Sequence, residues 1–335
     1  MSMGSGWALL AAPLAWLMLA VLEKATPSGF LKAHMREQPP GTSPVRQIGG
    51  LALVPLYLCA LAITAWLHPS DQTFVTALAA SAALLWLVGI ADDHRHQPIA
   101  LRLAAQFIAA MAVVLTLPPS LTVLGGIFPL WVERLLLVLA LVYAINVTNF
   151  MDGMDLMSVA GTGIPLCASA LLLAGGTAVP AIAFPVLAMA AGLLGFAAFN
   201  RPPARLYLGD NGALPLGLTS GIASAALAFE TNPVAAILPF GYYLADSAST
   251  LILRALHGEN LFHSHSGHAY QVARRAGRSV QWVLVRVVIA NLALALAAWF
   301  AARTANTAIF AASAAFGAGV SAGIVVHFRR QAKFA

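Results

Sequence analysis

The chain has 335 residues, of which 60% are hydrophobic and 9% are charged, whereas about 25% of the residues in an ordinary soluble domain are charged. So few charged side chains cannot cover the surface of a soluble globule, and two cysteines are too few for a secreted disulfide scaffold. A disordered chain is excluded as well, because it needs low hydrophobicity and high charge. The composition therefore predicts an all-α, polytopic membrane protein.

Apolar runs separated by polar or Pro/Gly-rich breaks predict about 11 transmembrane helices, since about 20 apolar residues are needed to cross ~30 Å of hydrocarbon. The first run has no Lys or Arg before it, so we expect a retained helix rather than a cleaved signal peptide. In chain order the predicted spans are Trp7–Leu22, Ile48–Leu67, Thr73–Ala91, Leu101–Leu117, Glu133–Ile145, Ser158–Leu173, Val179–Phe199, Gly212–Phe229, Val234–Leu256, Val280–Ala301 and Ala305–His327.

Lys and Arg are concentrated in alternate connections between these spans. By the positive-inside rule the side that carries them is cytoplasmic, which puts the N-terminus outside and the C-terminus in the cytoplasm. The net charge of +6 is thus a topology signal and does not indicate nucleic-acid binding. Of the 18 basic residues, 15 lie on the predicted cytoplasmic side: Lys24, Lys32, Arg36, Arg46, Arg95, Arg102, Arg201, Arg205, Arg254, Arg274, Arg275, Arg278, Arg329, Arg330 and Lys333.

Acidic and imidazole side chains fall on the same predicted side. A channel or proton relay would carry ionisable groups through the membrane midplane, and Asp246 is the one clear case here, so a channel is disfavoured. The polar side chains concerned are Asp92, Asp93, Asp152, Asp155, Asp210, His263, His265 and His268. We expect a single domain over residues 1–335, with catalytic loops around residues 23–47, 92–100, 146–157, 200–211 and 257–279.

Asp92 and Asp93 stand side by side where the third predicted span ends. Adjacent carboxylates at a membrane boundary are costly unless they meet cations, because like charges repel and burial penalises both. The pair suits a metal, a cationic partner or proton transfer. A helix-end charge cluster solvated by lipid headgroups is an equally good interpretation of the pair alone.

Polar side chains then recur at every third residue, from Asn146 through Asn149 and Asp152 to Asp155. This step keeps them near one face of a helix, and four oxygen donors suggest a hard cation such as Mg²⁺. A capped turn is the alternative, but a cap uses one such residue rather than four. We therefore favour a functional site.

Asp210 is flanked by glycines just before the eighth predicted span, and Arg205 precedes it. An Asp at this place is a natural helix cap, and for this motif alone the cap is the favoured interpretation. The glycines would also let a phosphate approach, and Arg205 is a candidate phosphate partner.

The loop before the tenth predicted span contains His263, His265 and His268, together with several arginines. The histidines suit zinc ligation, phosphate binding or an amphipathic interfacial segment. Oxygen-rich neighbouring motifs favour Mg²⁺ or Mn²⁺ over zinc. Contact with a phosphate or nucleotide is therefore the favoured interpretation.

Taken in this order, the motifs resemble the polyprenyl-phosphate N-acetylhexosamine-1-phosphate transferase family, which includes the phospho-MurNAc-pentapeptide transferase of peptidoglycan synthesis. Each motif alone is weak, but five in order over most of the chain are specific. The matching segments are Ser43-Pro-Val-Arg46-Gln-Ile-Gly49-Gly50, Asp92-Asp93 with Arg102 and Gln106, Asn146-x-x-Asn149-x-x-Asp152-Gly-x-Asp155, Pro203-Ala-x-x-x-x-Gly209-Asp210-x-Gly212, and Pro239 with Asp246 followed by the histidine loop.

The resemblance implies a Mg²⁺-dependent phosphoglycosyltransferase, with Mn²⁺ as a substitute, that moves a sugar 1-phosphate from a UDP-N-acetylhexosamine to undecaprenyl phosphate and releases UMP. It implies a multi-pass protein of the bacterial inner membrane with a cytoplasmic active site, and it leaves a homodimer open. By position, Asp210 and Asn149 match the metal ligands. The matching catalytic carboxylates are Asp92, Asp93, Asp152 and Asp155, and the substrate-binding candidates are Arg46, Asn146, Arg205, His263, His265 and His268. Arg102 and Asp246 are further site candidates without an assigned role, and anchoring of a neighbouring helix through an Arg is the alternative for Asp246.

The sequence departs from the common family motifs at several positions, and these departures indicate which branch of the family it resembles most. Asp152-Gly-Met-Asp155-Leu-Met replaces Asp-Gly-x-Asp-Gly-Leu, and Gly209-Asp-Asn-Gly-Ala replaces Gly-Asp-x-Gly-Ser. The histidine loop lacks the three consecutive histidines of the pentapeptide transferase and looks more like the branch that initiates O-antigen and other lipid-linked surface glycans. That branch accepts UDP-GlcNAc or UDP-N-acetylated 6-deoxy sugars, so the pentapeptide transferase is disfavoured. A lipid or phosphate transporter is the alternative from another class.

Overall fold

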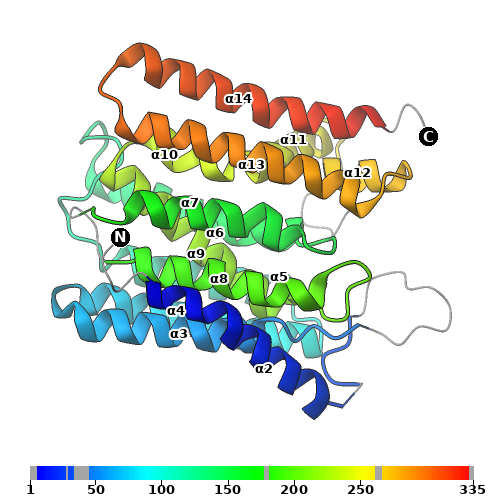
Figure 1. Ribbon diagram of the computed structural model, residues 1–335. Helices are drawn as coiled ribbons and strands as arrows, with labels where there is room; N and C mark the ends of the chain where they lie inside the picture. Colours follow the sequence, from blue (N-terminus) through cyan, green and yellow to red (C-terminus); the bar gives the residue numbers. More distant parts are fainter. Residues whose placement is uncertain (1–5, 28, 34–44, 177–180, 261–265, 332–335) are drawn as a thin grey trace.

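The computed structural model describes residues 6–27, 29–33, 45–176, 181–260 and 266–331. Figure 1 shows helices that run side by side in one elongated bundle. In the described part of the chain, extended pairing is limited to isolated bridges of Arg46 with Lys32 and with Leu206. The predicted all-α fold class is confirmed.

The bundle is built mainly from α-helices. Four short elements interrupt them: the 3₁₀ turns η1 (Trp7–Leu10), η2 (Pro69–Asp71) and η4 (Leu238–Phe240), and the π-helical turn η3 (Val159–Gly163). The α-helices are α2 (Ala11–Ala25), α3 (Gly50–Leu67), α4 (Gln72–His94), α5 (Ile99–Val114), α6 (Leu130–Met151), α7 (Ile164–Leu173), α8 (Ala183–Asn200), α9 (Asp210–Glu230), α10 (Pro233–Ile237), α11 (Gly241–Leu256), α12 (Ala269–Arg275), α13 (Val280–Arg303) and α14 (Thr307–Arg330).

Among the described residues, 9 helical stretches are long and apolar enough to cross a membrane. Two shorter apolar helices, Ile99–Val114 and Val159–Leu173, occupy the places of the fourth and sixth predicted spans. The polytopic helical architecture is thus confirmed, while the count of spans and their orientation stay predictions.

α6 continues beyond the predicted span Glu133–Ile145 and includes Asn146 and Asn149. An amide side chain in hydrocarbon is costly without a partner, which is why the sequence suggested an end at Ile145. The helix continues because Asn146 Nδ2 donates to Val142 O at 2.8 Å and to Gln106 Oε1 of α5 at 2.6 Å. The amide is therefore satisfied inside the bundle.

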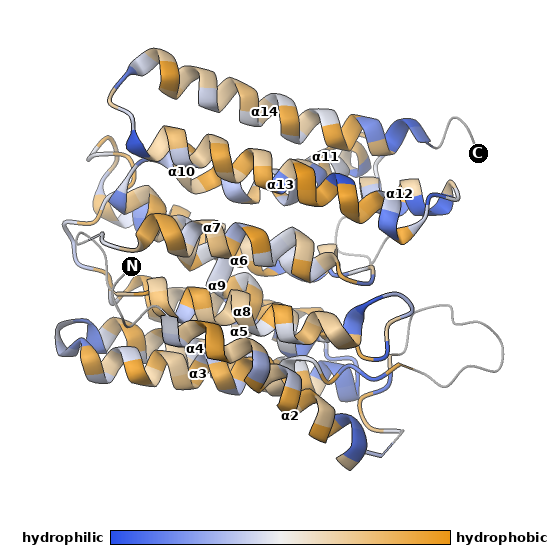
Figure 2. Ribbon diagram, in the orientation of Figure 1, coloured by the Kyte–Doolittle hydropathy of each residue, from blue (hydrophilic) through white to orange (hydrophobic). Residues whose placement is uncertain are grey.

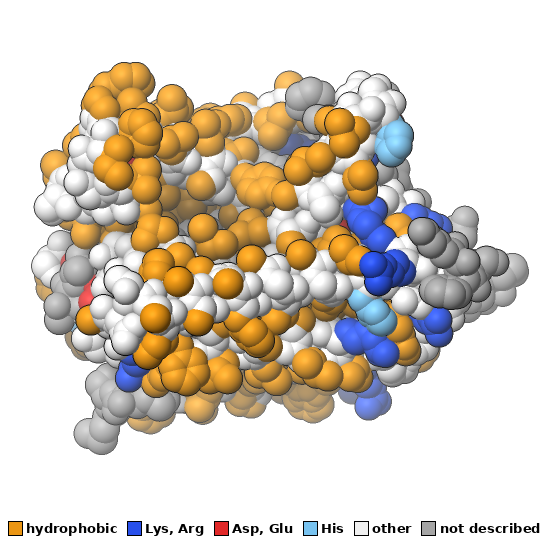
Figure 3. Space-filling view, turned by 90° about the horizontal axis from the view of Figure 1, so that it is seen from above, with side chains coloured by type: hydrophobic (Ala, Val, Ile, Leu, Met, Phe, Trp, Pro, Cys, Tyr) orange, Lys and Arg blue, Asp and Glu red, His pale blue; other side chains and the backbone are white. Residues whose placement is uncertain are grey.

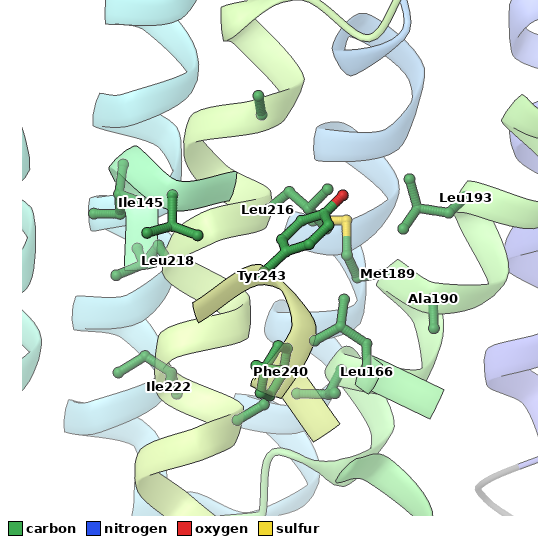
Figure 4. Packing of buried hydrophobic residues seen from close by; sticks show 14 of the residues in the cluster. Ile145, Leu166, Met189, Ala190, Leu193, Leu216, Leu218, Ile222, Phe240 and Tyr243 are labelled. Atoms are coloured by element: carbon green, nitrogen blue, oxygen red, sulfur yellow. The ribbon is translucent and has the colours of Figure 1, made fainter. Parts of the chain in front are cut away.

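α8 and α9 form the centre of the bundle, with 72% of each span buried, whereas α14 is peripheral at 28%. Figure 4 shows the apolar side chains of α6, α7, α8, α9 and α11 packed against one another around Tyr243. The Tyr243 hydroxyl donates to the backbone carbonyl of Met157 at 3.0 Å, so its polar end is satisfied in this apolar surrounding. This packing holds α9 among its neighbouring helices.

Two glycines let α9 begin close to α4. A Cβ at Gly89 of α4 would lie 2.5 Å from the backbone of Asn211, so a larger residue there would push the helices apart. Gly209, the residue before α9, has a φ of +77°, a conformation that side chains other than glycine rarely adopt. Together they place Asp210 beside the last turn of α4.

Hydrophilic residues gather at the two ends of the bundle (Figure 2). We call the end at which α4 and α6 finish and α9 begins the polar end. Figure 3 shows a broad hydrophobic surface with Lys and Arg side chains collected at one end of it. This distribution matches a helix bundle whose apolar sides face lipid and whose basic end faces water.

Candidate active site

Asp210, the first residue of α9, meets side chains from α5 and α6 at the polar end. Asn149 Nδ2 donates to Asp210 Oδ1 at 2.8 Å, and Arg102 Nη1 lies 3.3 Å from Asp210 Oδ2. The same Arg102 nitrogen donates to Asp92 Oδ2 of α4 at 3.1 Å. One guanidinium thus joins two carboxylates from different helices, and this group of four side chains keeps a net negative charge.

Asp93 has a different set of partners from its neighbour. Its Oδ1 accepts from Gln47 Nε2 at 2.7 Å and from the backbone N–H of Asp210 at 3.0 Å. Its Oδ2 accepts from the backbone N–H of Asn211 at 2.9 Å and from Asn211 Nδ2 at 2.5 Å. Asp93 therefore caps the N-terminus of α9 from α4, where a carboxylate also complements the helix dipole.

The two members of the acidic pair consequently differ in what they can offer a substrate. Both carboxylate oxygens of Asp93 accept hydrogen bonds from protein donors, and Asp93 is 3% exposed. Asp92 accepts from the Gln97 N–H at 2.8 Å and otherwise faces Arg102 and, at 3.7 Å, His96 Nδ1. The Asp210 and Arg102 side chains are 20% and 29% exposed, so the opening to solvent lies over them.

Asp152 and Asp155 hold the segment that follows α6. Ser158 Oγ donates to Asp152 Oδ1, and the Ala204 N–H donates to Asp155 Oδ2 at 3.1 Å. Asn200 accepts from the Leu156 N–H at 2.7 Å and so fixes the same segment from the end of α8. α6 ends at Met151, so Asp152 and Asp155 lie in the turn beyond it. The expectation that they share one helix face with Asn146 and Asn149 is therefore wrong, because the three-residue step continues past the end of the helix.

Arg46 and Arg205 contact the end of α2 in the described structure. Arg46 donates to the carbonyl oxygens of Thr26 at 2.8 Å and of Glu23 at 2.9 Å, which satisfies the C-terminus of that helix. Arg205 pairs with Glu23 Oε2 at 3.2 Å and lies over the Phe199 ring at 4.8 Å. A role of either arginine in substrate binding stays a prediction.

His268 and Asp246 are fully buried neighbours beneath α12. His268 Nδ1 lies 3.4 Å from Asp246 Oδ1, which also accepts from the Ala269 N–H at 2.8 Å. Asp246 therefore anchors the start of α12 to α11, and Tyr242 donates to its other oxygen at 3.2 Å. His263 and His265 lie outside the described residues.

The resemblance implies a Mg²⁺ ion, and the side chains around Asp210 are the candidates to hold it. In the described ranges, no three His, Cys, Asp or Glu side chains are grouped to hold a metal on their own. Mg²⁺ usually takes one or two carboxylates together with water and substrate phosphates, so a smaller donor set suffices. Asp210, Asp92 and the amide of Asn149 are oxygen-bearing side chains at a site with excess negative charge, and they fit this chemistry.

An apolar groove of about 620 Å³ lies along α7, α8 and α13. Leu156 lines it, and this residue follows Asp155 directly. A hydrocarbon chain in this groove would therefore run close to the segment that carries Asp152 and Asp155.

Sequence reasoning did not single out Gln47, Gln97 or Asn211. Gln47 and Asn211 lie inside quoted motifs, and an Asn beside a capping Asp is a local signal that could have been followed. Their shared partner is Asp93, which is distant from both in sequence. Such a three-element contact is visible only once the helices are packed.

Comparisons with known proteins cover the part of the chain that carries this site. The family model for glycosyl transferase family 4 matches residues 75–228, which include Asp92, Asn149 and Asp210. The decaprenyl-phosphate N-acetylglucosaminephosphotransferase of Mycolicibacterium smegmatis is 31% identical over 219 residues, 58% of this chain and 53% of the relative. The matched part of the chain is thus similar to polyprenyl-phosphate N-acetylhexosamine-1-phosphate transferases, as the motifs indicated.

Further relatives match different shares of the chain. The decaprenyl-phosphate N-acetylglucosaminephosphotransferase of Mycobacterium leprae is 27% identical over 295 residues, 77% of this chain and 73% of the relative. The phospho-N-acetylmuramoyl-pentapeptide-transferase of a Synechocystis strain is 41% identical over 113 residues, 33% of this chain and 29% of the relative. The chain thus spans between about a third and about half of the length of the first relatives it matches (29% and 53%).

Proposed function

We propose that the protein transfers a sugar 1-phosphate from a UDP-N-acetylhexosamine to undecaprenyl phosphate and releases UMP. The observation that carries the proposal is the group formed by Asp210, Asn149, Arg102 and Asp92 at the end of an otherwise apolar bundle. A lipid acceptor keeps its chain in the bilayer while a nucleotide sugar stays in water. Their phosphates can meet only at the membrane boundary, where this group lies.

The chemistry follows from the substrates. An oxygen of the acceptor phosphate attacks the sugar-bearing phosphorus of the donor, a new P–O bond forms, and the bridging P–O bond to UMP breaks. The sugar's own C–O bond is untouched, so its anomeric configuration is retained. Because the acceptor phosphate is already largely dianionic near pH 7, a direct displacement needs little proton removal.

Each side chain of the site then has a defined task. The Arg102 guanidinium lies between both carboxylates and is placed to offset charge on the transferred phosphate. Asp92 orients the acceptor phosphate and takes a residual proton, whereas Asp93 positions Asp210 through the start of α9. Asp210 and Asn149 would hold Mg²⁺, which when bound neutralises the donor diphosphate.

For the donor we propose UDP-GlcNAc or a UDP-N-acetylated 6-deoxy sugar, with the reaction on the cytoplasmic face of a bacterial inner membrane. The mycobacterial relatives named as N-acetylglucosaminephosphotransferases support this choice. The pentapeptide transferase remains the second candidate, and the names of the cyanobacterial relatives favour it.

The decisive experiment measures UMP release by the purified protein with undecaprenyl phosphate, Mg²⁺ and a panel of UDP sugars that includes the UDP-MurNAc-pentapeptide. We expect release with an N-acetylhexosamine donor and none after Asp210→Ala at any Mg²⁺ concentration. Transport of lipid without UMP release would instead establish the transporter alternative. Radiolabelled phospho-sugar trapped on the protein from donor alone, and lost in Asp92→Asn, would replace direct displacement by a covalent route.

A further inference from the structure

In the C-terminal part of the chain, all Asp, Glu, Lys and Arg residues after Glu259 are basic. No Asp or Glu follows Glu259, so the last helices carry positive charge without acidic neighbours in sequence. Arg303 lies at the end of α13 remote from the polar end. The basic residues of this part are Arg274, Arg275, Arg278, Arg286, Arg303, Arg329, Arg330 and Lys333.

Within this part, four side chains of α13, α14 and the turn before them form a compact group that we call the Trp282 cluster: Arg278, Trp282, Arg286 and His327. The Arg286 guanidinium carbon lies 3.6 Å from the centre of the Trp282 ring, and that of Arg278 lies 5.2 Å from it. The His327 ring stacks on Trp282 at 5.2 Å and 18°. The indole is thus the platform on which the cations are held.

The cluster is fixed by neutral acceptors, which leave its charge in place. Arg286 donates from Nη1 to the carbonyl of Trp282 at 2.9 Å and from Nε to His327 Nε2 at 3.2 Å. Arg278 donates from Nε to Gln331 Oε1 at 2.9 Å. Neither guanidinium has an ion-pair partner within the described residues. Two cations are therefore aligned without an anion of the protein.

The place of the cluster in the bundle indicates where such an anion would come from. Arg286 is six residues into α13, about 9 Å along the helix axis at 1.5 Å per residue, on a helix that spans the apolar layer. α14 is a peripheral helix, so its side faces lipid rather than protein. A tryptophan beside cations at this depth is typical of the headgroup level of a membrane.

We infer that the Trp282 cluster binds the headgroup phosphate of an anionic membrane phospholipid. Charge complementarity carries the choice of occupant, since two guanidinium groups without carboxylate partners present fork-shaped donors that match a phosphate. Basic pockets between membrane helices on the cytoplasmic side bind such headgroups in the same way. The cluster shares no residue with the group of Asp210, Asn149, Arg102 and Asp92, so the inference concerns a second lipid besides the acceptor proposed above.

The test titrates the full-length protein in neutral detergent with phosphatidylglycerol and follows its thermal unfolding midpoint. We expect saturable stabilisation by phosphatidylglycerol, none by phosphatidylcholine and none by inorganic phosphate at equal concentration. The double variant Arg278→Gln, Arg286→Gln should need more phosphatidylglycerol to reach half of the maximal rise in the unfolding midpoint, by roughly fivefold for each charge removed. Arg303→Gln is the matched control, because its guanidinium lies 3.7 Å from the Trp299 ring at the other end of the same helix.

An unchanged phosphatidylglycerol response in the double variant would overturn the inference, and so would equal stabilisation by inorganic phosphate. If the double variant does not fold, the wild-type titration at rising ionic strength decides instead. Stabilisation that weakens with salt supports a phosphate contact, and stabilisation that does not change with salt contradicts it. None of these measurements depends on UMP release, so the inference can fail independently of the proposed function.

Discussion

Asp92 and Asp93 are neighbours in sequence, yet the packing of α4 gives their side chains separate partners. Asp93 accepts four hydrogen bonds from Gln47, Asp210 and Asn211, all from protein donors. Asp92 shares Arg102 with Asp210. Adjacent residues on a helix point about 100° apart, so one can serve the packing while the other serves the site.

We therefore expect the two conservative variants of the pair to separate stability from activity. Asp93→Asn replaces one accepting oxygen by a donor and leaves buried donors unpaired, at about 1–3 kcal/mol for each, so its thermal unfolding midpoint should fall by several degrees. Asp92→Asn keeps an oxygen for the Gln97 N–H and should unfold near the wild-type temperature, while UMP release falls roughly 100-fold or more. Thermal unfolding and the UMP assay on both variants check this. An Asp93→Asn protein as stable as wild type would contradict the cap.

A site contact could be predicted from the sequence where a local motif indicates it, and could not where it joins residues that are far apart in the chain. The three-residue spacing grouped Asn149 with the acidic motifs, and the structure places it 2.8 Å from Asp210, although its role as a metal ligand stays a prediction. The capping of α9 by Asp93 and the contribution of Gln47 were not predicted. They depend on how closely α3, α4 and α9 pack, which no local pattern encodes.

At the scale of elements, the contact between α4 and α9 brings Asp92 to Asp210. Gly89 permits it, because its missing side chain leaves room for the backbone of Asn211. The helical spans were predictable because hydrocarbon requires long apolar helices. The ends of the helices were less predictable. α6 extends to Met151 because its amide side chains form hydrogen bonds inside the bundle.

Gly89→Ala should consequently damage the site, although Gly89 lies about one helix turn before Asp92 and Asp93. The added Cβ would lie 2.5 Å from backbone atoms of Asn211, which cannot rotate away, so α4 must shift. Overpacking of this kind costs about 1–3 kcal/mol, and we expect a lower unfolding midpoint together with loss of UMP release. Gly319→Ala in α14 is the control, because nothing lies within 4 Å of the added atom. Equal behaviour of the two variants would show that the close approach is not needed.

At the scale of the whole molecule, charge distribution and architecture point to one orientation. The acidic site and the Trp282 cluster both lie at the polar end, and most basic residues collect there (Figure 3). The positive-inside rule predicts that this end is cytoplasmic. This assignment decides whether a soluble nucleotide sugar of the cytoplasm can reach Asp210 at all.

Cysteine labelling in intact cells tests the orientation. In a protein with Cys59→Ala and Cys167→Ala, Arg95→Cys should react with a membrane-impermeant maleimide only after the membrane is opened, because Arg95 lies exposed at the polar end. Ser120→Cys, exposed in the connection between α5 and α6 at the opposite end, should react in intact cells. UMP release by both variants would show that the labelled proteins keep the native fold. The reverse labelling pattern would place the acidic site outside and would rule out a cytoplasmic UDP-sugar donor.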